Sequence, residues 1–115
     1  MIEDNSFELS TGDNYDIEKI TEVIKGKLVA ICVLCTMQKF NLEIQSADYP
    51  SLVILDERNI PNGNLFVVPK INIYNVSEKN QDQKHMGHIT LNDKIYIKLS
   101  GHKQMTAIVT LRCEN

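Results

Sequence analysis

The sequence lacks most of the residues and motifs that usually reveal a function. Its 115 residues include no tryptophan, three prolines and five glycines, and only 6% are aromatic. No linker, internal repeat or low-complexity tract divides the chain, so we expect one domain over residues 1–115, with residues 1–14 able to form an extended N-terminal arm. Folding buries about 65% of the unfolded surface at this size, which is enough for a core without disulfides or metal.

Long apolar runs are also missing, and we expect no signal peptide. The longest wholly apolar run covers eight residues, 28–35, whereas about 20 are needed to cross a bilayer. The N-terminus is acidic and polar, with no basic segment before an apolar stretch, which argues against a signal peptide. Three cysteines, an odd number, argue against a disulfide framework and for a reducing compartment. We expect synthesis in a host cytoplasm and no membrane partner.

Basic clusters are absent from the charge pattern. The net charge is -3, the pI is near 5.5, and the lysines are scattered along the chain. A protein that binds nucleic acid needs a clustered basic face to neutralise phosphates. The sequence therefore predicts no nucleic-acid partner.

Motifs for catalysis and for cofactors are absent as well. The chain has no Gly-x-Ser-x-Gly elbow, no Gly-rich phosphate loop, no His-Glu-x-x-His pair and no dinucleotide fingerprint. His85, His88 and His102 lie in polar, turn-rich segments, where we interpret them as solvated loop residues. We expect no enzyme activity, no catalytic residue and no cofactor.

One group of residues has the composition of a zinc site, namely Cys32-x-x-Cys35 with His85-x-x-His88. In an extended strand, residues three apart point to opposite faces and lie about 10 Å apart. One zinc ion, with Zn–S bonds of about 2.3 Å, cannot bind two such thiolates. We therefore interpret both cysteines as small buried hydrophobes, predict no metal site, and rank a metal-dependent protein behind the functions considered below.

What the chain does contain is alternation with a period of two, which is typical of half-buried antiparallel strands. Ile95, Ile97 and Leu99 alternate with polar residues, and the pattern resumes from Met105 to Cys113. With turns at residues 92–94 and 100–104, the end of the chain is predicted to form a meander in which Leu99 pairs with Met105.

Further strands are predicted upstream. Residues 27–36 are apolar on both faces, so we expect a central strand covered on both sides and joined in a hairpin to a strand at 40–44. Pro69 lies within an expected long strand at 65–76 and has no N–H, which places it at an edge or a bulge. The other expected elements are an edge strand at 6–9, a short strand at 52–55 and a polar loop at 77–87.

A helix competes with a strand only at residues 16–25. Ile17, Ile20 and Ile24 have helical spacing, Asp16 suits an N-cap and Gly26 a C-terminus, so we favour a short helix or irregular segment. The β-branched residues here favour a strand instead. Seven or eight strands with at most this one helix predict an all-β fold, an antiparallel β-sandwich of jelly-roll-like type.

The order of these elements resembles a known family. The resemblance spans residues 26–113 and rests on Gly26-Lys27 before an apolar strand, Phe40 to Ile44, Ile60-Pro61-Asn62-Gly63, Ile71-Asn72-Ile73, and the ending Asp93 to Ile97 with Met105 to Val109. This series is similar to the small β-sandwich proteins of tailed-bacteriophage heads: decoration, auxiliary capsid and head-fibre proteins.

The resemblance implies a structural virion protein that binds the outside of a capsid as a decoration (cementing) or head-fibre component. Its partners would be the major capsid protein or other virion proteins, and we expect a homo-oligomer located in the virion. The alternative is a small soluble module that binds a ligand or glycan through an exposed tyrosine, although the chain has no tryptophan platform. As possible assembly contacts we single out Tyr96, Lys98, Ile108, Arg112 and Pro69.

Overall fold

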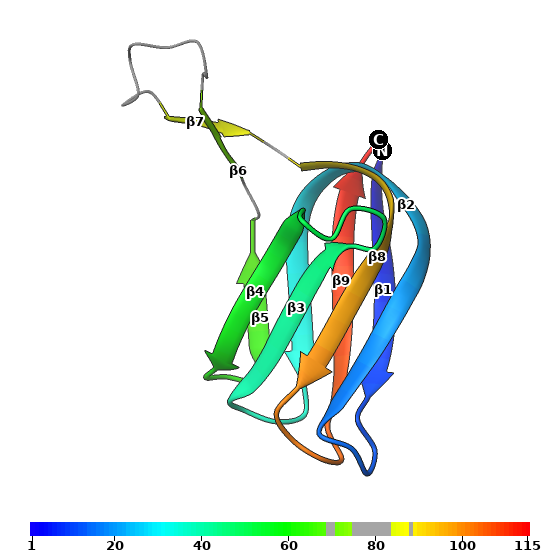
Figure 1. The fold of residues 1–115 in the computed structure, drawn as a ribbon, viewed down its shortest axis with the longest axis vertical. Helices are drawn as coiled ribbons and strands as arrows, with labels where there is room; N and C mark the ends of the chain where they lie inside the picture. The colour runs from blue at the N-terminus through cyan, green and yellow to red at the C-terminus, as the bar shows by residue number, and fades with distance from the viewer. Residues whose placement is uncertain (69–70, 75–83, 88) are drawn as a thin grey trace.

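The computed structural model describes residues 1–68, 71–74, 84–87 and 89–115, and these residues form β-strands and no helix (Figure 1). The strands are β1 (Ile2–Ser10), β2 (Asp16–Cys35), β3 (Phe40–Ser46), β4 (Val53–Ile60), β5 (Asn64–Val67), β6 (Ile71–Tyr74), β7 (Lys84–Gly87), β8 (Ile89–Ser100) and β9 (Thr106–Glu114). Strands β6 and β7 pair with each other as a separate two-stranded sheet.

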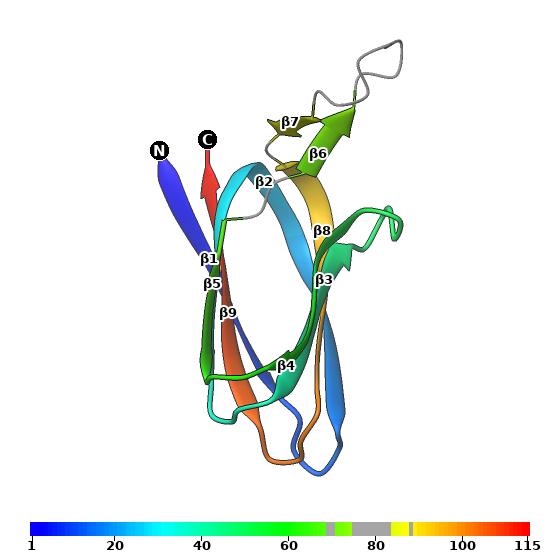
Figure 2. The ribbon, with the colours of Figure 1, turned by 90° about the vertical axis from the view of Figure 1, so that its left-hand side faces the viewer.

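The other seven strands form one antiparallel sheet that folds back on itself into two layers (Figure 2). Strand β2, 20 residues long, belongs to both layers. Its residues 16–28 pair with β8, and its residues 27–35 pair with β9, with β5 on the other side. One layer, called here the β9 layer, has the order β1-β9-β2-β5, and the other, the β8 layer, has the order β2-β8-β3-β4.

The hydrophobic core lies between the two layers. The predicted alternation is confirmed, because Ile95, Ile97 and Leu99 of β8 and Val109 and Leu111 of β9 are all fully buried. Burial of a side chain of this size stabilises the fold by about 1.5–3 kcal/mol. The largest fully buried side chains are Leu9, Leu28, Ile31, Phe40, Leu42, Ile44, Leu91, Ile95, Ile97, Leu99, Met105 and Leu111.

The predicted fold class, an all-β antiparallel β-sandwich, is confirmed. The strand pairs nest inward from the two chain ends: β1 pairs with β9, β2 with β9 and β8, and β3 with β8. The N-terminal segment forms an edge strand, Ile2–Ser10, that is longer than the one expected at residues 6–9.

The helix favoured at residues 16–25 is wrong, since these residues belong to β2. A β-bulge between Ile20 and Val23 explains the misleading pattern. Because of the bulge, the consecutive inward-facing residues Thr21 and Ile24, both buried, are three residues apart instead of two. A spacing of three is typical of a helix. Ile20, the middle residue of the supposed helical face, is 62% exposed.

The predicted meander is also wrong in its connections. Strand β8 continues through residues 92–94 without a turn. Leu91 and Ile95 are four residues apart and both face the core, as they do in an uninterrupted strand. Residues 101–105 then carry the chain into the other layer, so β8 pairs with β2 and β3 while β9 pairs with β1 and β2. Leu99 and Met105 are therefore not cross-strand partners; Leu99 pairs with Ile17 and Leu42.

Three further expectations need correction. The strand at 40–44 forms no hairpin with residues 27–36, because residues 36–39 cross between layers and β3 pairs with β4 and β8. The long strand expected at 65–76 is two strands, β5 and β6, and part of the loop expected at 77–87 is strand β7. Pro69, placed at an edge or bulge by the sequence, lies outside the described residues.

Gly26 lies where β2 passes from one layer to the other. Its φ of +119° is a conformation that residues with a Cβ rarely adopt. A Cβ added there would lie 2.6 Å from Oδ1 of Asn115 and 3.1 Å from the backbone oxygen of Glu114. The bend therefore depends on glycine twice, for its backbone angle and for the close approach of the C-terminal strand.

The hydroxyl of Thr21 completes the hydrogen bonding at the bulge. The Ile95 N–H donates to Thr21 Oγ1 over 3.1 Å, and this hydroxyl donates to the backbone oxygen of Glu22 over 2.7 Å. Thr21 is only 5% exposed, so no water can easily replace it. The side chain thus satisfies a buried N–H that the irregular ladder leaves without a strand partner.

We expect Gly26→Ala to destabilise the protein by about 3 kcal/mol or more, because strained backbone and displacement of the C-terminal residues add together. Urea unfolding followed by circular dichroism measures this loss. The matched control is Gly12→Ala, at a φ of +58° with no atom within 4 Å of the added Cβ, which should cost only about 1 kcal/mol. Equal losses in the two variants would contradict the packing constraint at Gly26.

A second prediction concerns the bulge. Thr21→Val keeps the side-chain shape but leaves the Ile95 N–H buried without an acceptor, so we expect a loss of about 1–3 kcal/mol in the free energy of unfolding. Thr21→Ser retains the hydroxyl and should lose less in the same denaturant titration. A serine variant that is as destabilising as the valine variant would contradict this role of the hydrogen bond, because Thr21→Ser keeps the hydroxyl and loses only the methyl group.

Candidate interaction surface

The residues predicted as assembly contacts lie on two opposite sides of the molecule. Tyr96 and Lys98 face outward from β8, whereas Ile108 and Arg112 face outward from β9, and these strands belong to different layers. The sequence pattern identified outward positions correctly but not the crossover that separates them. Pro69, the fifth predicted contact, lies outside the described residues.

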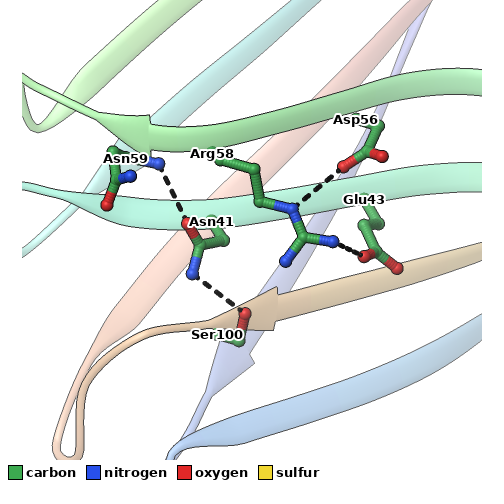
Figure 3. A network of polar contacts seen from close by, with 6 residues as sticks. All are labelled: Asn41, Glu43, Asp56, Arg58, Asn59 and Ser100. Carbon is green, nitrogen blue, oxygen red and sulfur yellow. Dashed lines mark hydrogen bonds and ion pairs between the residues drawn. The ribbon is translucent and has the colours of Figure 1, made fainter.

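The outer face of the β8 layer is charged. Four charged residues lie opposite one another across the neighbouring strands β2, β8, β3 and β4, namely Glu18, Lys98, Glu43 and Asp56. Arg58 forms ion pairs with Glu43, at 2.5 Å, and with Asp56, at 3.3 Å (Figure 3). These exposed pairs each contribute at most about 1 kcal/mol, so they keep the face solvated more than they stabilise it.

An amide network continues this polar face toward the end of β8. The Asn59 N–H donates to Oδ1 of Asn41 over 2.9 Å, and Nδ2 of Asn41 donates to Oγ of Ser100 over 3.5 Å (Figure 3). Asn59 has a positive φ of 53°, which asparagine tolerates better than most residues. The network fixes the end of β4 against β3 and β8.

Tyr96 lies among the acidic residues of this face. The pKa of Tyr96 is raised to about 12, most of all by burial and next by the Glu18 carboxylate, which is its hydrogen-bond acceptor and a nearby negative charge, with smaller effects from Glu43 and Asp16. The phenol therefore stays protonated, and can donate a hydrogen bond, at pH values above its usual pKa of 10.0. This predicted contact residue has a local partner and belongs to the charged face.

The outer face of the β9 layer is very different, because hydroxyl and apolar groups predominate. Ser6 and Thr110 share a hydrogen bond of 2.8 Å between β1 and β9, and Ser10 and Thr106 share another of the same length. These pairs join the edge strand β1 to its neighbour without using charge.

Arg112 is held by the edge strand. Its Nε and Nη2 donate to the two carboxylate oxygens of Asp4, over 2.8 and 3.0 Å. This hydrogen bonding lowers the pKa of Asp4 and raises that of Arg112. The bidentate pair ties β1 to β9, so the structure gives Arg112 a partner within the same layer.

Next to these polar pairs is a contiguous apolar patch, which we define as Cys32, Leu34, Phe66 and Ile108. Leu34 is 62% exposed, Phe66 65% and Ile108 43%. In the strand register Cys32 lies opposite Phe66, and Leu34 lies opposite Ile108. A shallow hollow of about 440 Å³ extends along β2 and β5 beside these side chains.

Of the predicted contacts, Ile108 alone belongs to the apolar patch. Leu34 and Phe66 were missed, although a signal for Leu34 was present in the two-sided apolar pattern of residues 27–36. That pattern predicted a strand covered on both sides, and this expectation is wrong for the described residues. One face packs in the core through Ile31 and Val33, which are buried, while the other exposes Leu34.

The cysteine arrangement follows the geometry expected of a strand. Cys32 faces outward in the apolar patch, while Cys35 packs against the core. Burial raises the pKa of the Cys35 and Cys113 thiols. His88 and the side chain of His85 lie outside the described residues. Among the residues that are described, no group of three or more His, Cys, Asp or Glu is placed to hold a metal ion.

His102 is half-buried, which differs from the solvated loop residue that was expected. Its Nε2 lies 2.8 Å from the backbone oxygen of Gln38 and 3.2 Å from that of Lys39. Two carbonyl acceptors require this nitrogen to carry the proton. His102 therefore links the two loops that cross between the layers, which is a structural role.

Comparison with protein-family profiles, with curated protein sequences and with solved structures gave no significant match. Within the described part of the chain, no helix is long and apolar enough to cross a membrane.

A titration tests the environment of Tyr96. One tyrosine of the folded protein should ionise with a pKa of about 12, as measured by phenolate absorbance, and this transition should be missing in Tyr96→Phe. Glu18→Gln should lower that pKa, because the negative charge that opposes ionisation is removed. A transition that persists in Tyr96→Phe would assign it to another tyrosine.

The same shift has a consequence for stability. The phenol of Tyr96 ionises at a lower pH in the unfolded chain, near 10, than in the folded protein, where its pKa is about 12. Its contribution is therefore complete below pH 10 and is lost as the pH rises toward 12. Over that interval, wild type should lose more stability than Tyr96→Phe.

Proposed function

We propose that the protein is a structural component of a tailed-bacteriophage particle, which attaches to the outside of the capsid through the apolar patch of the β9 layer. The observation that carries this proposal is the outward side of β2, where Leu34 is 62% exposed beside Phe66 at 65%. Burying each side chain against a partner is worth about 1.5–3 kcal/mol. Residues 28–35 of β2 are all apolar, which is typical of a strand that is buried on both faces. A partner surface would bury the outward face that the fold leaves exposed.

The chemistry of this face supports a protein partner. The centres of protein interfaces are depleted in charge and enriched in aromatic side chains, with polar groups at the rim. The apolar patch contains no charged residue, and the hydroxyl pairs of β1 and β9 lie beside it. The charged face of the β8 layer would then remain in solvent, which keeps an attached copy soluble on its outer side.

Attachment to a capsid suits a patch of this modest size. The patch offers a few apolar side chains, so one contact with a partner would be weak. On a symmetric shell, many copies meet many equivalent sites, and a protein with more than one point of attachment gains affinity without any new contact. The family resemblance over residues 26–113 supports the capsid as the partner surface.

The exposed tyrosines give the glycan-binding alternative little support. Tyr15 and Tyr49 are both 65% exposed. Tyr15 lies near the start of β3, beside Gly101, and has the Lys103 ammonium 5.1 Å from its ring centre. Tyr49 follows the end of β3 instead. The two rings form no common platform.

The test is made on virus particles purified from cells that express this chain. Quantitative mass spectrometry should find the chain in a fixed ratio to the coat protein, and its absence would overturn the proposal. Leu34→Lys places a charge in the apolar patch and should reduce the bound amount at least tenfold. Lys98→Ala, on the opposite face, is the matched control and should bind as wild type does.

A further inference from the structure

The sandwich has four edges, and three of them carry features that discourage strand pairing. Exposed edge strands are usually protected by charged side chains or by bulges, since a bare edge pairs with any other strand. Strand β2 has a bulge between Ile20 and Val23, and β4 is irregular at two points against β3. The charged residues at these edges are Glu3, Asp4 and Glu8 in β1, Asp16, Glu18, Lys19, Glu22 and Lys25 in the part of β2 before Gly26, and Asp56, Glu57 and Arg58 in β4.

The fourth edge, β5, has no charge and no bulge within the strand, which is four residues long and is followed in the sequence by Pro69 and Lys70. Residues 64–68 read Asn-Leu-Phe-Val-Val, without a charge or a proline, and the register of β5 against β2 has no irregularity. Phe66 and Val68 are 65% and 49% exposed. Within the described residues, β5 pairs with β2 and with no other strand.

The hydrogen-bond pattern shows which backbone groups of β5 are available. The Cys35 N–H donates to the Gly63 oxygen over 2.7 Å, which makes these two residues a hydrogen-bonded pair. Such pairs alternate along an antiparallel ladder, so Leu65 and Val67 direct their backbone groups to β2. Asn64 and Phe66 direct theirs to the open edge, and their side chains lie on the outer face.

We propose that two copies of this chain pair through β5, antiparallel about a twofold axis, and extend the β9 layer into one continuous sheet. The open backbone groups lie at every second residue, so they match when Phe66 faces Phe66 of the second copy and Asn64 faces its Val68. This register uses residues 64–68 of both chains and brings two exposed aromatic rings together across the axis.

Charge and symmetry favour a second copy as the occupant. Each chain carries a net charge of -3, so two copies repel each other least where the edge itself is uncharged. A twofold contact needs a surface that is complementary to itself, and an uncharged antiparallel strand meets this condition. Pairing would also place the two apolar patches side by side on one face, although the inference itself does not rest on the proposed function.

Sedimentation equilibrium of the purified chain tests the pairing. Wild type should be dimeric at tens of micromolar, and Phe66→Lys and Asn64→Lys should each raise the dimer dissociation constant at least tenfold. Ile108→Lys is the matched control: it puts the same charge on the same face, but on β9 and not at the edge, and should leave the dimer intact. Circular dichroism identifies any variant that fails to fold.

Cross-linking gives an independent measurement. Residues in a hydrogen-bonded antiparallel pair have Cα atoms about 5.5 Å apart, which is within the range for a disulfide. Phe66→Cys should therefore form a covalent dimer on oxidation. The variant is made with Cys32→Ser, because Cys32 lies opposite residue 66 in the same chain and would compete. Ile108→Cys in that background should remain uncross-linked.

Three outcomes would overturn the inference: a wild-type chain that stays monomeric up to millimolar concentration, a dimer that survives both lysine substitutions, or a dimer that Ile108→Lys disrupts as strongly. Each of them leaves the proposed attachment to particles open, because that test uses Leu34 on the central strand β2 and not on the edge. Failure of the two proposals can thus be distinguished.

Discussion

The bend of strand β2 at Gly26 is the constraint on which the rest of the structure depends. One strand of 20 residues pairs with β8 before the bend and with β9 and β5 after it, so a single chain segment holds both layers. The crossing requires a positive φ at position 26 and a close approach of Asn115, and glycine allows both. The bulge with its Thr21 hydroxyl adjusts the register before the bend.

This shared strand also decides which side chains meet. Because β2 brings β8 and β9 into different layers, their alternating apolar residues face each other across the core instead of lying in one sheet. Their polar residues are consequently sent to opposite outer faces. The loops that cross between layers are then secured by local contacts, among them the imidazole of His102 on the backbone oxygens of Gln38 and Lys39.

The two outer faces have different chemistry, and this difference underlies both proposals. The β8 layer presents exposed, paired charges and the partly buried phenol of Tyr96. The β9 layer presents Leu34, Phe66 and Ile108 beside hydroxyl pairs, and it ends at the uncharged strand β5. A partner surface on the face and a second copy at the edge would meet at Phe66 and otherwise cover different parts of the same layer.

The sequence by itself determined the all-β class, the alternation of β8 and β9 and the opposite orientations of Cys32 and Cys35, because a period of two is a local property of the backbone. It also contained the two-sided apolar pattern of β2 that leads to Leu34. Only the tertiary structure decided that residues 16–25 are a strand, since the bulge between Ile20 and Val23 imitates helical spacing. The tertiary structure alone placed Tyr96 and Lys98 on one outer face and Ile108 and Arg112 on the other. The reason is that the pairing of distant strands depends on where β2 bends, and the sequences of β8 and β9 contain no signal for that bend.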